Sequence, residues 1–115
     1  MKILIVDDHK EMRKILRSIV LEESGTKDEI IECANGNEAI EQFSLHQPDC
    51  VLMDVQLKGM NGFDATEKIH ENFPEAKIII ITSHNSPAFR QKAVDLHAVG
   101  FVSKDNLSEL SLYLH

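Results

Sequence analysis

The apolar positions of this chain follow two patterns that alternate along its length. Short continuous runs, typical of strands buried on both faces, are followed by longer stretches in which apolar residues recur every three or four positions, as on one face of a helix. The most apolar runs cover residues 3–6, 50–53, 78–81 and 101–102, and a run flanked by charges covers 29–33. The pattern therefore predicts five strands separated by helices.

Five stretches have helical spacing, and their apolar residues predict the faces that pack on the strands. These faces are Met12, Ile15, Leu16, Ile19 and Val20; Ala39, Ile40 and Phe43; Phe63, Thr66, Ile69 and Phe73; Phe89, Ala93 and Leu96; and Leu107, Leu110 and Leu114. Capping and helix-breaking residues predict the helix boundaries. The predicted starts are Asn35, Ser86–Pro87 and a capping box of Asn106 with Glu109, the predicted ends are Gly25 and Gly100, and the breaks are Pro48–Asp49 and Pro74.

Strands that alternate with helices predict an α/β fold, here a doubly wound, five-stranded parallel sheet of the flavodoxin-like type with five helices. The strand at 29–33 is the least apolar and ends without a candidate ligand, so we place it at an edge. This placement gives the strand order 2-1-3-4-5. A length of 115 residues leaves room for one domain, 1–115, whose last helix we expect to be cut short.

Charge and composition argue against several classes of function. The formal charge is −7, and a surface of that sign repels phosphates, so we expect no direct binding of nucleic acid by this segment. No stretch approaches the ~20 apolar residues of a membrane helix, and no signal peptide is visible. Cys33 and Cys50 are too few for a disulfide scaffold and lie in strand-like segments, which indicates reduced core residues in a cytoplasmic protein.

Four of the apolar runs end in side chains that can bind metal or phosphate, namely Asp7 and Asp8, Asp54, Thr82 with Ser83, and Lys104. In an open parallel sheet, ligands bind in the crevice at the carboxyl ends of the strands, so these residues should meet in one cleft. Each has an ordinary explanation when taken alone, such as a turn or a helix cap for the aspartates. Their occurrence together favours a functional site.

Three carboxylates in one cleft repel each other and need a counter-charge. A divalent cation such as Mg²⁺, together with Lys104, brings the formal total near zero. We expect Asp8 and Asp54 to be direct ligands and Asp7 to act directly or through water. The backbone carbonyl of Gln56 is a candidate for a further oxygen ligand.

Across essentially its whole length the chain resembles the receiver domain of two-component response regulators. The matching motifs are Val6-Asp7-Asp8, Met53-Asp54, Gly59-Met60-Asn61-Gly62, Ile81-Thr82-Ser83 and Gly100-Phe101-Val102-Ser103-Lys104. The resemblance implies a Mg²⁺ site at Asp7, Asp8 and Asp54. It also implies that Asp54 accepts a phosphoryl group from a sensor histidine kinase or a histidine phosphotransfer protein, and that the chain catalyses its own phosphorylation and slow dephosphorylation.

The resemblance further implies a switch. Lys104 would pair with the phosphoryl group, the Thr82 hydroxyl would move toward it, and the Phe101 ring would turn inward and remodel the surface around the fourth helix, fifth strand and fifth helix. Gln56 and His84 would lie beside the attacking water and tune hydrolysis of the phosphoaspartate. A homodimer formed on activation and a link to transcription regulation, through a helix-turn-helix output domain, are further expectations from the family.

Two other functions stay open. A Mg²⁺-dependent phosphohydrolase would use Asp54 as its nucleophile, but Gln56 stands where such enzymes usually place a general-acid aspartate. A protein-docking module of the same fold would never be phosphorylated, although the side chains that phosphorylation needs are present. The six histidines lack the spacing of a zinc site, and His84 is the one expected nearest the chemistry.

Overall fold

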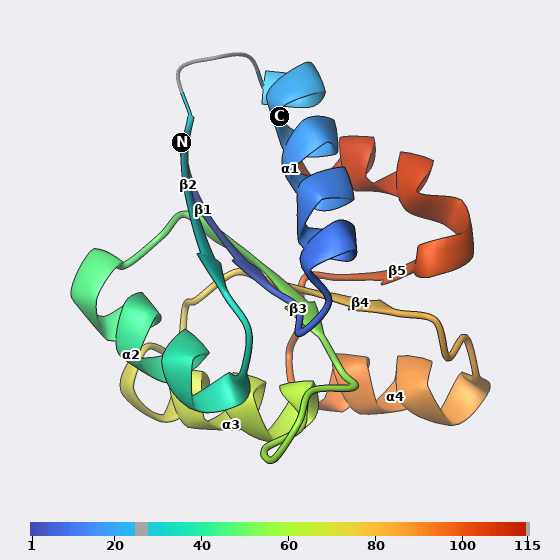
Figure 1. The fold of residues 1–115 in the computed structure, drawn as a ribbon. Coiled ribbons are helices and arrows are strands. Elements are labelled where there is room, and N and C mark those ends of the chain that lie inside the picture. Colours follow the sequence, from blue (N-terminus) through green and yellow to red (C-terminus); the bar gives the residue numbers. More distant parts are fainter. Residues whose placement is uncertain (25–27, 115) are drawn as a thin grey trace.

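The computed structural model describes residues 1–24 and 28–114, in which strands and helices alternate as the sequence pattern predicts (Figure 1). The strands of this part of the chain are β1 (Lys2–Val6), β2 (Glu29–Cys33), β3 (Cys50–Asp54), β4 (Ile78–Thr82) and β5 (Gly100–Ser103). Its helices are α1 (Lys10–Ser24), α2 (Gly36–His46), α3 (Gly62–Asn72), α4 (Pro87–Asp95) and the 3₁₀ segment η1 (Lys104–Leu112).

The strands form one parallel sheet in the order β2-β1-β3-β4-β5. The predicted fold class and strand order are therefore confirmed, with the charge-flanked strand β2 at an edge. β1, β3 and β4 are the interior strands, and they are buried almost throughout because helices cover both of their faces.

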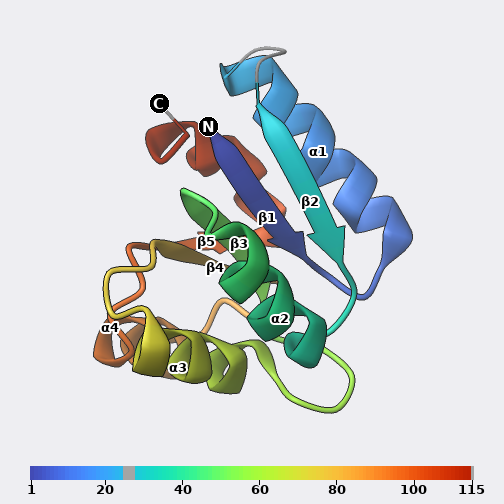
Figure 2. The same ribbon diagram turned by 90° about the vertical axis from the view of Figure 1, so that its left-hand side faces the viewer.

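Side chains of the interior strands alternate between two cores. Leu4, Met53 and Ile80 pack on the side that carries α2, α3 and α4. Ile5, Leu52 and Ile81 pack on the other side, beneath α1 and η1. Figures 1 and 2 show these two helical layers with the sheet between them. The alternation matters for function, because it also decides the face on which the residue after each strand lies.

Several predicted helix starts and the cysteine assignment are confirmed. Asn35 caps α2 by accepting the Glu38 N–H, and Ser86 caps α4 by accepting the Phe89 N–H. Cys33 and Cys50 are buried and free. None of the helices in the described part of the chain has the length and apolar character that a membrane crossing requires. Gly25, expected to end α1, lies outside the described residues.

The prediction that Gly100 ends the fourth helix is wrong. α4 stops at Asp95, and His97 takes a left-handed backbone conformation with φ of 60°, so the chain reverses before it reaches the glycine. Gly100 instead begins β5, where an added Cβ would lie 2.5 Å from Cζ of Tyr113. The glycine is needed because the tyrosine ring covers the backbone at this position.

The last helix also differs from its prediction. η1 is a 3₁₀ helix that begins at Lys104, with Ser103 as its cap accepting the Asp105 N–H. Asn106, predicted to open the helix, lies inside η1 with non-helical angles (φ −141°, ψ 56°), and its side chain accepts from the Ser108 hydroxyl. The Ser103 hydroxyl provides the first cap, so the helix starts earlier than the Asn106 capping box suggests.

Candidate functional site

The register of the sheet brings Asp7 and Asp54 together. β1 and β3 pair through Val6 and Met53, so the next residue on each strand comes at the same edge of the sheet. Both side chains lie on the side of α1 and η1, because residues two positions earlier pack there. They are almost fully buried, with 0% and 1% of their surfaces exposed.

Lys104, which follows β5, is the counter-charge of this pair. Its Nζ lies 3.0 Å from Oδ2 of Asp7 and 3.3 Å from Oδ2 of Asp54. Burial raises the pKa of Asp54, and the nearby Asp7 raises it further, whereas Lys104 and the Gln56 N–H act in the opposite direction. Burial by itself would lower the pKa of Lys104, but Asp7 and Asp54 together outweigh it and the pKa is raised. One ammonium thus faces two buried carboxyl groups.

Asp8 and His9 extend the acidic group toward solvent. Ligand atoms of Asp7, Asp8, His9 and Asp54 all lie within 4.8 Å of one another. The backbone N–H of His9 donates to Oδ1 of Asp7 at 2.8 Å, and its ring Nδ1 lies 2.9 Å from Oδ1 of Asp8. His9 was missed in the sequence, where its position directly after the two aspartates was the only available signal.

The donor set of this pocket fits a divalent cation. Oδ2 of Asp7, Oδ1 of Asp8 and Oδ2 of Asp54 are buried, and none of them accepts a hydrogen bond within residues 1–24 and 28–114. A buried oxygen that accepts no hydrogen bond is costly, and the single Lys104 ammonium faces only two of these three oxygens, so the group is short of positive charge. Three carboxylates against the one ammonium of Lys104 leave two formal negative charges, which a cation such as Mg²⁺ would balance.

The loops after β3 and β4 meet at the rim of the pocket. Thr82 is buried at the end of β4, and its Oγ1 accepts the His84 N–H at 3.0 Å. Ser83 donates to Oε1 of Gln56 at 3.1 Å, and the Gln56 N–H donates to Oδ1 of Asp54 at 3.3 Å. Gln56 therefore links Asp54 to the loop that carries the hydroxyl groups.

The loop from Asp54 to α3 returns close to its starting point. An added Cβ at Gly62 would overlap the carbonyl oxygen of Asp54 and lie 2.8 Å from its carbonyl carbon. Asn61 caps α3 by accepting the Asp64 N–H, which sets Gly62 as the first helical residue. Gly59 has a positive φ of 79°, as expected for a glycine in a tight loop. Gly62 is needed for a different reason, which is the close approach of two backbone segments.

Phe101 is partly buried on β5 and packs against the core on the side that carries α4. The Arg90 guanidinium carbon lies 4.7 Å from the centre of its ring, and Arg90 Nε also donates to Oδ1 of Asn85 at 2.8 Å. Asn85 belongs to the loop that follows Thr82. A single α4 side chain therefore contacts both the predicted aromatic switch residue and the loop after β4.

Comparison with known proteins decides the family. The response regulator receiver domain model matches residues 3–114. This chain belongs to that family. It is 38% identical over 103 residues to the chemotaxis protein CheY of Halobacterium salinarum, covering 90% of this chain and 83% of that protein. It is 34% identical over 106 residues to the oxygen regulatory protein NreC of Staphylococcus haemolyticus, covering 91% of this chain but 48%, about half, of that relative.

Solved structures agree with this assignment. A LuxR-family two-component response regulator from Aurantimonas shares 35% identity and superposes with a TM-score of 0.82, over 90% of this chain and 73% of that one. The receiver domain is thus a module of two-component signalling. Its structure brings Asp7, Asp8, Asp54 and Lys104 into one pocket and adds His9 to them. The roles of these residues, and the Gln56 carbonyl as a ligand, stay predictions.

Proposed function

We propose that this receiver domain is a cytoplasmic, Mg²⁺-dependent phosphorylation switch whose acceptor is Asp54. The donor is a phosphohistidine on a sensor histidine kinase or a histidine phosphotransfer protein. The observation that carries the proposal is the state of the Asp54 carboxyl group: it is buried, its Oδ2 accepts no hydrogen bond from the described residues, and that oxygen faces the Lys104 ammonium at 3.3 Å. A buried carboxylate oxygen that faces an ammonium without an aligned hydrogen bond supports a role as the phosphoryl acceptor.

The transfer is a substitution at phosphorus. A carboxylate oxygen of Asp54 forms the new P–O bond, the P–N bond of the phosphohistidine breaks, and the imidazole nitrogen keeps the electron pair. Gln56 N–H holds Oδ1 of Asp54, which leaves Oδ2 on the side of Lys104. Lys104 then neutralises charge on the phosphoryl oxygens.

Asp7, Asp8 and Asp54 would hold the metal through their carboxylate oxygens. Bound Mg²⁺ supplies charge neutralisation on the transferred group and orients its oxygens. The chain's own contribution is a preassembled pocket, because the sheet register and the two ion pairs to Lys104 fix Asp7 and Asp54 before the donor arrives.

Phosphorylation adds roughly one negative charge and three strong acceptor oxygens. The Thr82 hydroxyl can donate a hydrogen bond to one of these oxygens. Its oxygen accepts the His84 N–H, while its own proton is used in no hydrogen bond of the described residues. Movement of that hydroxyl toward the phosphoryl group would let Phe101 turn inward and change the surface of α4, β5 and η1. Val94 and Leu112 are exposed apolar residues of that surface, which we propose as the place where activated copies dimerise.

The test supplies a small-molecule phosphoryl donor with Mg²⁺ to the full chain and measures intact mass. We expect one base-labile phosphoryl group per chain, lost in Asp54→Asn and suppressed by chelation of the metal. Asp49→Asn is the matched control, because Asp49 is an exposed aspartate just before the same strand. Modification that persists in Asp54→Asn would contradict the acceptor assignment.

The same experiment separates the alternatives. Repeated consumption of the donor, with many equivalents of phosphate released per chain, would favour the phosphohydrolase. A chain that binds Mg²⁺ yet never gains mass, with either the small donor or a phosphorylated histidine kinase, would favour the docking module.

A further inference from the structure

We infer that His9 is a ligand of the metal pocket and gives it a stronger preference for divalent cations that accept nitrogen, such as Mn²⁺, Co²⁺ and Ni²⁺, than an all-oxygen site would have. The inference rests on the acidic pocket of the proposed function. It extends that pocket by one residue, which lies outside the acidic set predicted from the sequence.

Distances between the ligand atoms support this assignment. Nδ1 of His9 lies 2.9 Å from Oδ1 of Asp8 and 3.4 Å from Oδ1 of Asp7. Ligands bound at about 2.1 Å on adjacent corners of an octahedron are about 3 Å apart. The imidazole nitrogen and the Asp8 oxygen thus already have the spacing of neighbouring ligands of one ion, and the Asp7 carboxylate lies close to both.

The contact between His9 and Asp8 is close without being a hydrogen bond. Oδ1 of Asp8 is buried and accepts none from the described residues, although the ring nitrogen is 2.9 Å away. The ring nitrogen and the carboxylate oxygen lie close together without donor–acceptor alignment. This is the arrangement of two ligands that bind the same metal ion. Oδ2 of Asp7 and Oδ2 of Asp54 are also buried, and the Lys104 ammonium is the positive group that faces both of them.

The backbone of His9 is fixed, whereas its ring is accessible. The His9 N–H donates to Asp7, and its carbonyl accepts the Arg13 N–H at the start of α1. The side chain is 71% exposed, so the ring can close over a cation from the solvent side without moving the fold. Imidazole binds Ni²⁺ and Zn²⁺ readily, and Co²⁺ and Mn²⁺ progressively less tightly, whereas Mg²⁺ prefers oxygen ligands.

An ordinary role for His9 makes the opposite prediction. If the ring were an imidazolium paired with Asp8 and Asp7, its positive charge would compete with the cation, and its removal would strengthen binding of every divalent ion alike. If the ring instead binds the metal, its removal should weaken binding selectively for the cations that accept nitrogen. The sign of the change on substitution therefore separates the two roles.

The experiment measures cation binding by the full chain, with no phosphoryl donor present. Titration calorimetry with Ni²⁺ and Mg²⁺ compares wild type, His9→Asn and the matched control His46→Asn, which removes an imidazole from the end of α2. We expect His9→Asn to weaken Ni²⁺ binding about tenfold or more while Mg²⁺ binding changes little, and His46→Asn to leave both unchanged. Pulsed EPR of bound Mn²⁺ should show nitrogen coupling in wild type that is absent in His9→Asn.

Two results would overturn the inference: Ni²⁺ bound equally well by wild type and His9→Asn, or tighter binding of both cations in that variant. Asp8→Asn checks the location, since the nitrogen coupling should weaken when a neighbouring ligand is removed. Failure here is distinguishable from failure of the proposed function. Bound Mn²⁺ without nitrogen coupling removes only His9 from the site, whereas a chain that binds no cation at all would contradict the Mg²⁺ pocket itself.

Discussion

At their carboxyl ends the strands bury two carboxyl groups beside one lysine, whereas at their amino ends the charged side chains of the same sheet lie in solvent. We call these regions the carboxyl edge (Asp7, Asp54, Thr82 and Lys104) and the amino edge (Asp49, Glu75, Lys77, Val99 and Gly100). At the carboxyl edge, buried oxygens of Asp7 and Asp54 accept no hydrogen bond from the described residues. At the amino edge, Asp49, Glu75 and Lys77 are exposed.

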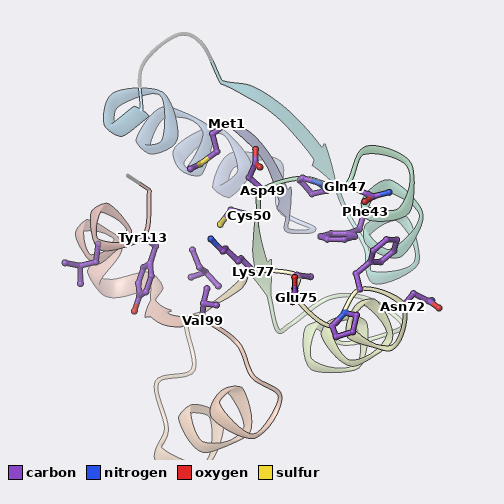
Figure 3. A pocket seen from close by; sticks show the side chains of 16 residues that line it. Met1, Phe43, Gln47, Asp49, Cys50, Asn72, Glu75, Lys77, Val99 and Tyr113 are labelled. Atoms are coloured by element: carbon purple, nitrogen blue, oxygen red, sulfur yellow. The ribbon is translucent and has the colours of Figure 1, made fainter.

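A hollow with mixed apolar and polar walls, shown in Figure 3, lies at the amino edge. Phe43, Cys50, Val99 and Tyr113 are among its lining residues. Burial raises the pKa of the Cys50 thiol to about 12, so this cysteine stays protonated and unreactive near neutral pH. The amino edge thus follows the usual rule of buried apolar groups and solvated charges. The carboxyl edge breaks that rule, which is expected where chemistry rather than stability has selected the residues.

The largest expected effect comes from removing the charge at the carboxyl edge. Lys104→Met leaves Asp7 and Asp54 buried without their ion-pair partner, and loss of one member of a buried pair costs about 3–5 kcal/mol. Lys77→Met, at the exposed amino edge, should change the free energy of unfolding by less than about 0.5 kcal/mol. Urea unfolding with chelator present measures both.

A double variant sharpens this result. Lys104→Met should cost less in an Asp54→Asn background, because only one buried carboxylate then remains to be compensated. If the two lysine substitutions cost the same in the wild-type background, the contrast between the two edges would be wrong.

A second expected effect is the pH dependence that Asp54 gives the carboxyl edge. Its pKa is raised in the folded state, by burial first and by Asp7 next, so the folded chain binds its proton more tightly than the unfolded chain does. Stability contributed by protonated Asp54 is therefore fully present below the unfolded pKa, near 3.8, and is lost as pH rises through the higher folded value. Relative to Asp54→Asn, wild type should gain stability as pH is lowered from 7 in the absence of metal. Unfolding curves that stay parallel across this range would contradict the assigned direction.

The sequence predicts the fold well because local patterns determine it. Each apolar run lies within one strand, and the weaker run at 29–33 correctly indicates the edge strand. The gathering of Asp7, Asp54 and Lys104 was also predictable, since parallel strands bring their carboxyl ends to one edge. No detailed coordinate was needed for that step.

Features that depend on contacts between distant segments could not be predicted from local sequence patterns. Gly100 looked like a helix end, but it is required by the ring of Tyr113, and nothing in the local sequence reveals that contact. Gly62 stood out only as part of a matching motif, but it is required by its close approach to the Asp54 carbonyl. His9 was not among the predicted site residues, because only the structure shows its ring nitrogen 2.9 Å from Asp8.

The two glycines allow the same substitution to be compared at the two edges. Gly62→Ala forces a Cβ into the backbone of Asp54, which cannot move without disturbing the pocket, so we expect a loss of about 3 kcal/mol, at the upper end of the usual range for overpacking. Gly100→Ala meets a tyrosine ring that can rotate away, and about 1 kcal/mol is expected. Gly62→Ala should also reduce cation binding, whereas Gly100→Ala should not. Equal losses of stability with intact cation binding in both variants would contradict the assigned role of Gly62.

The smallest expected effect concerns the connection from the carboxyl edge to β5. The Arg90 guanidinium lies over the Phe101 ring, and a partly exposed cation–π contact contributes about 0.5–1 kcal/mol. A double-mutant cycle of Arg90→Leu with Phe101→Leu should therefore give a coupling energy of that size. The matched control pairs Lys92→Leu with Phe63→Leu, where the ammonium is 6.0 Å from the ring centre, at the limit of such contacts, and less coupling is expected. If Arg90 holds Phe101 in its resting position, Arg90→Leu should also broaden or shift the NMR signals of the Phe101 ring without phosphorylation. Zero coupling together with unchanged ring signals would mean that the arginine covers the ring without restraining it, and that the response of Phe101 depends on Thr82 alone.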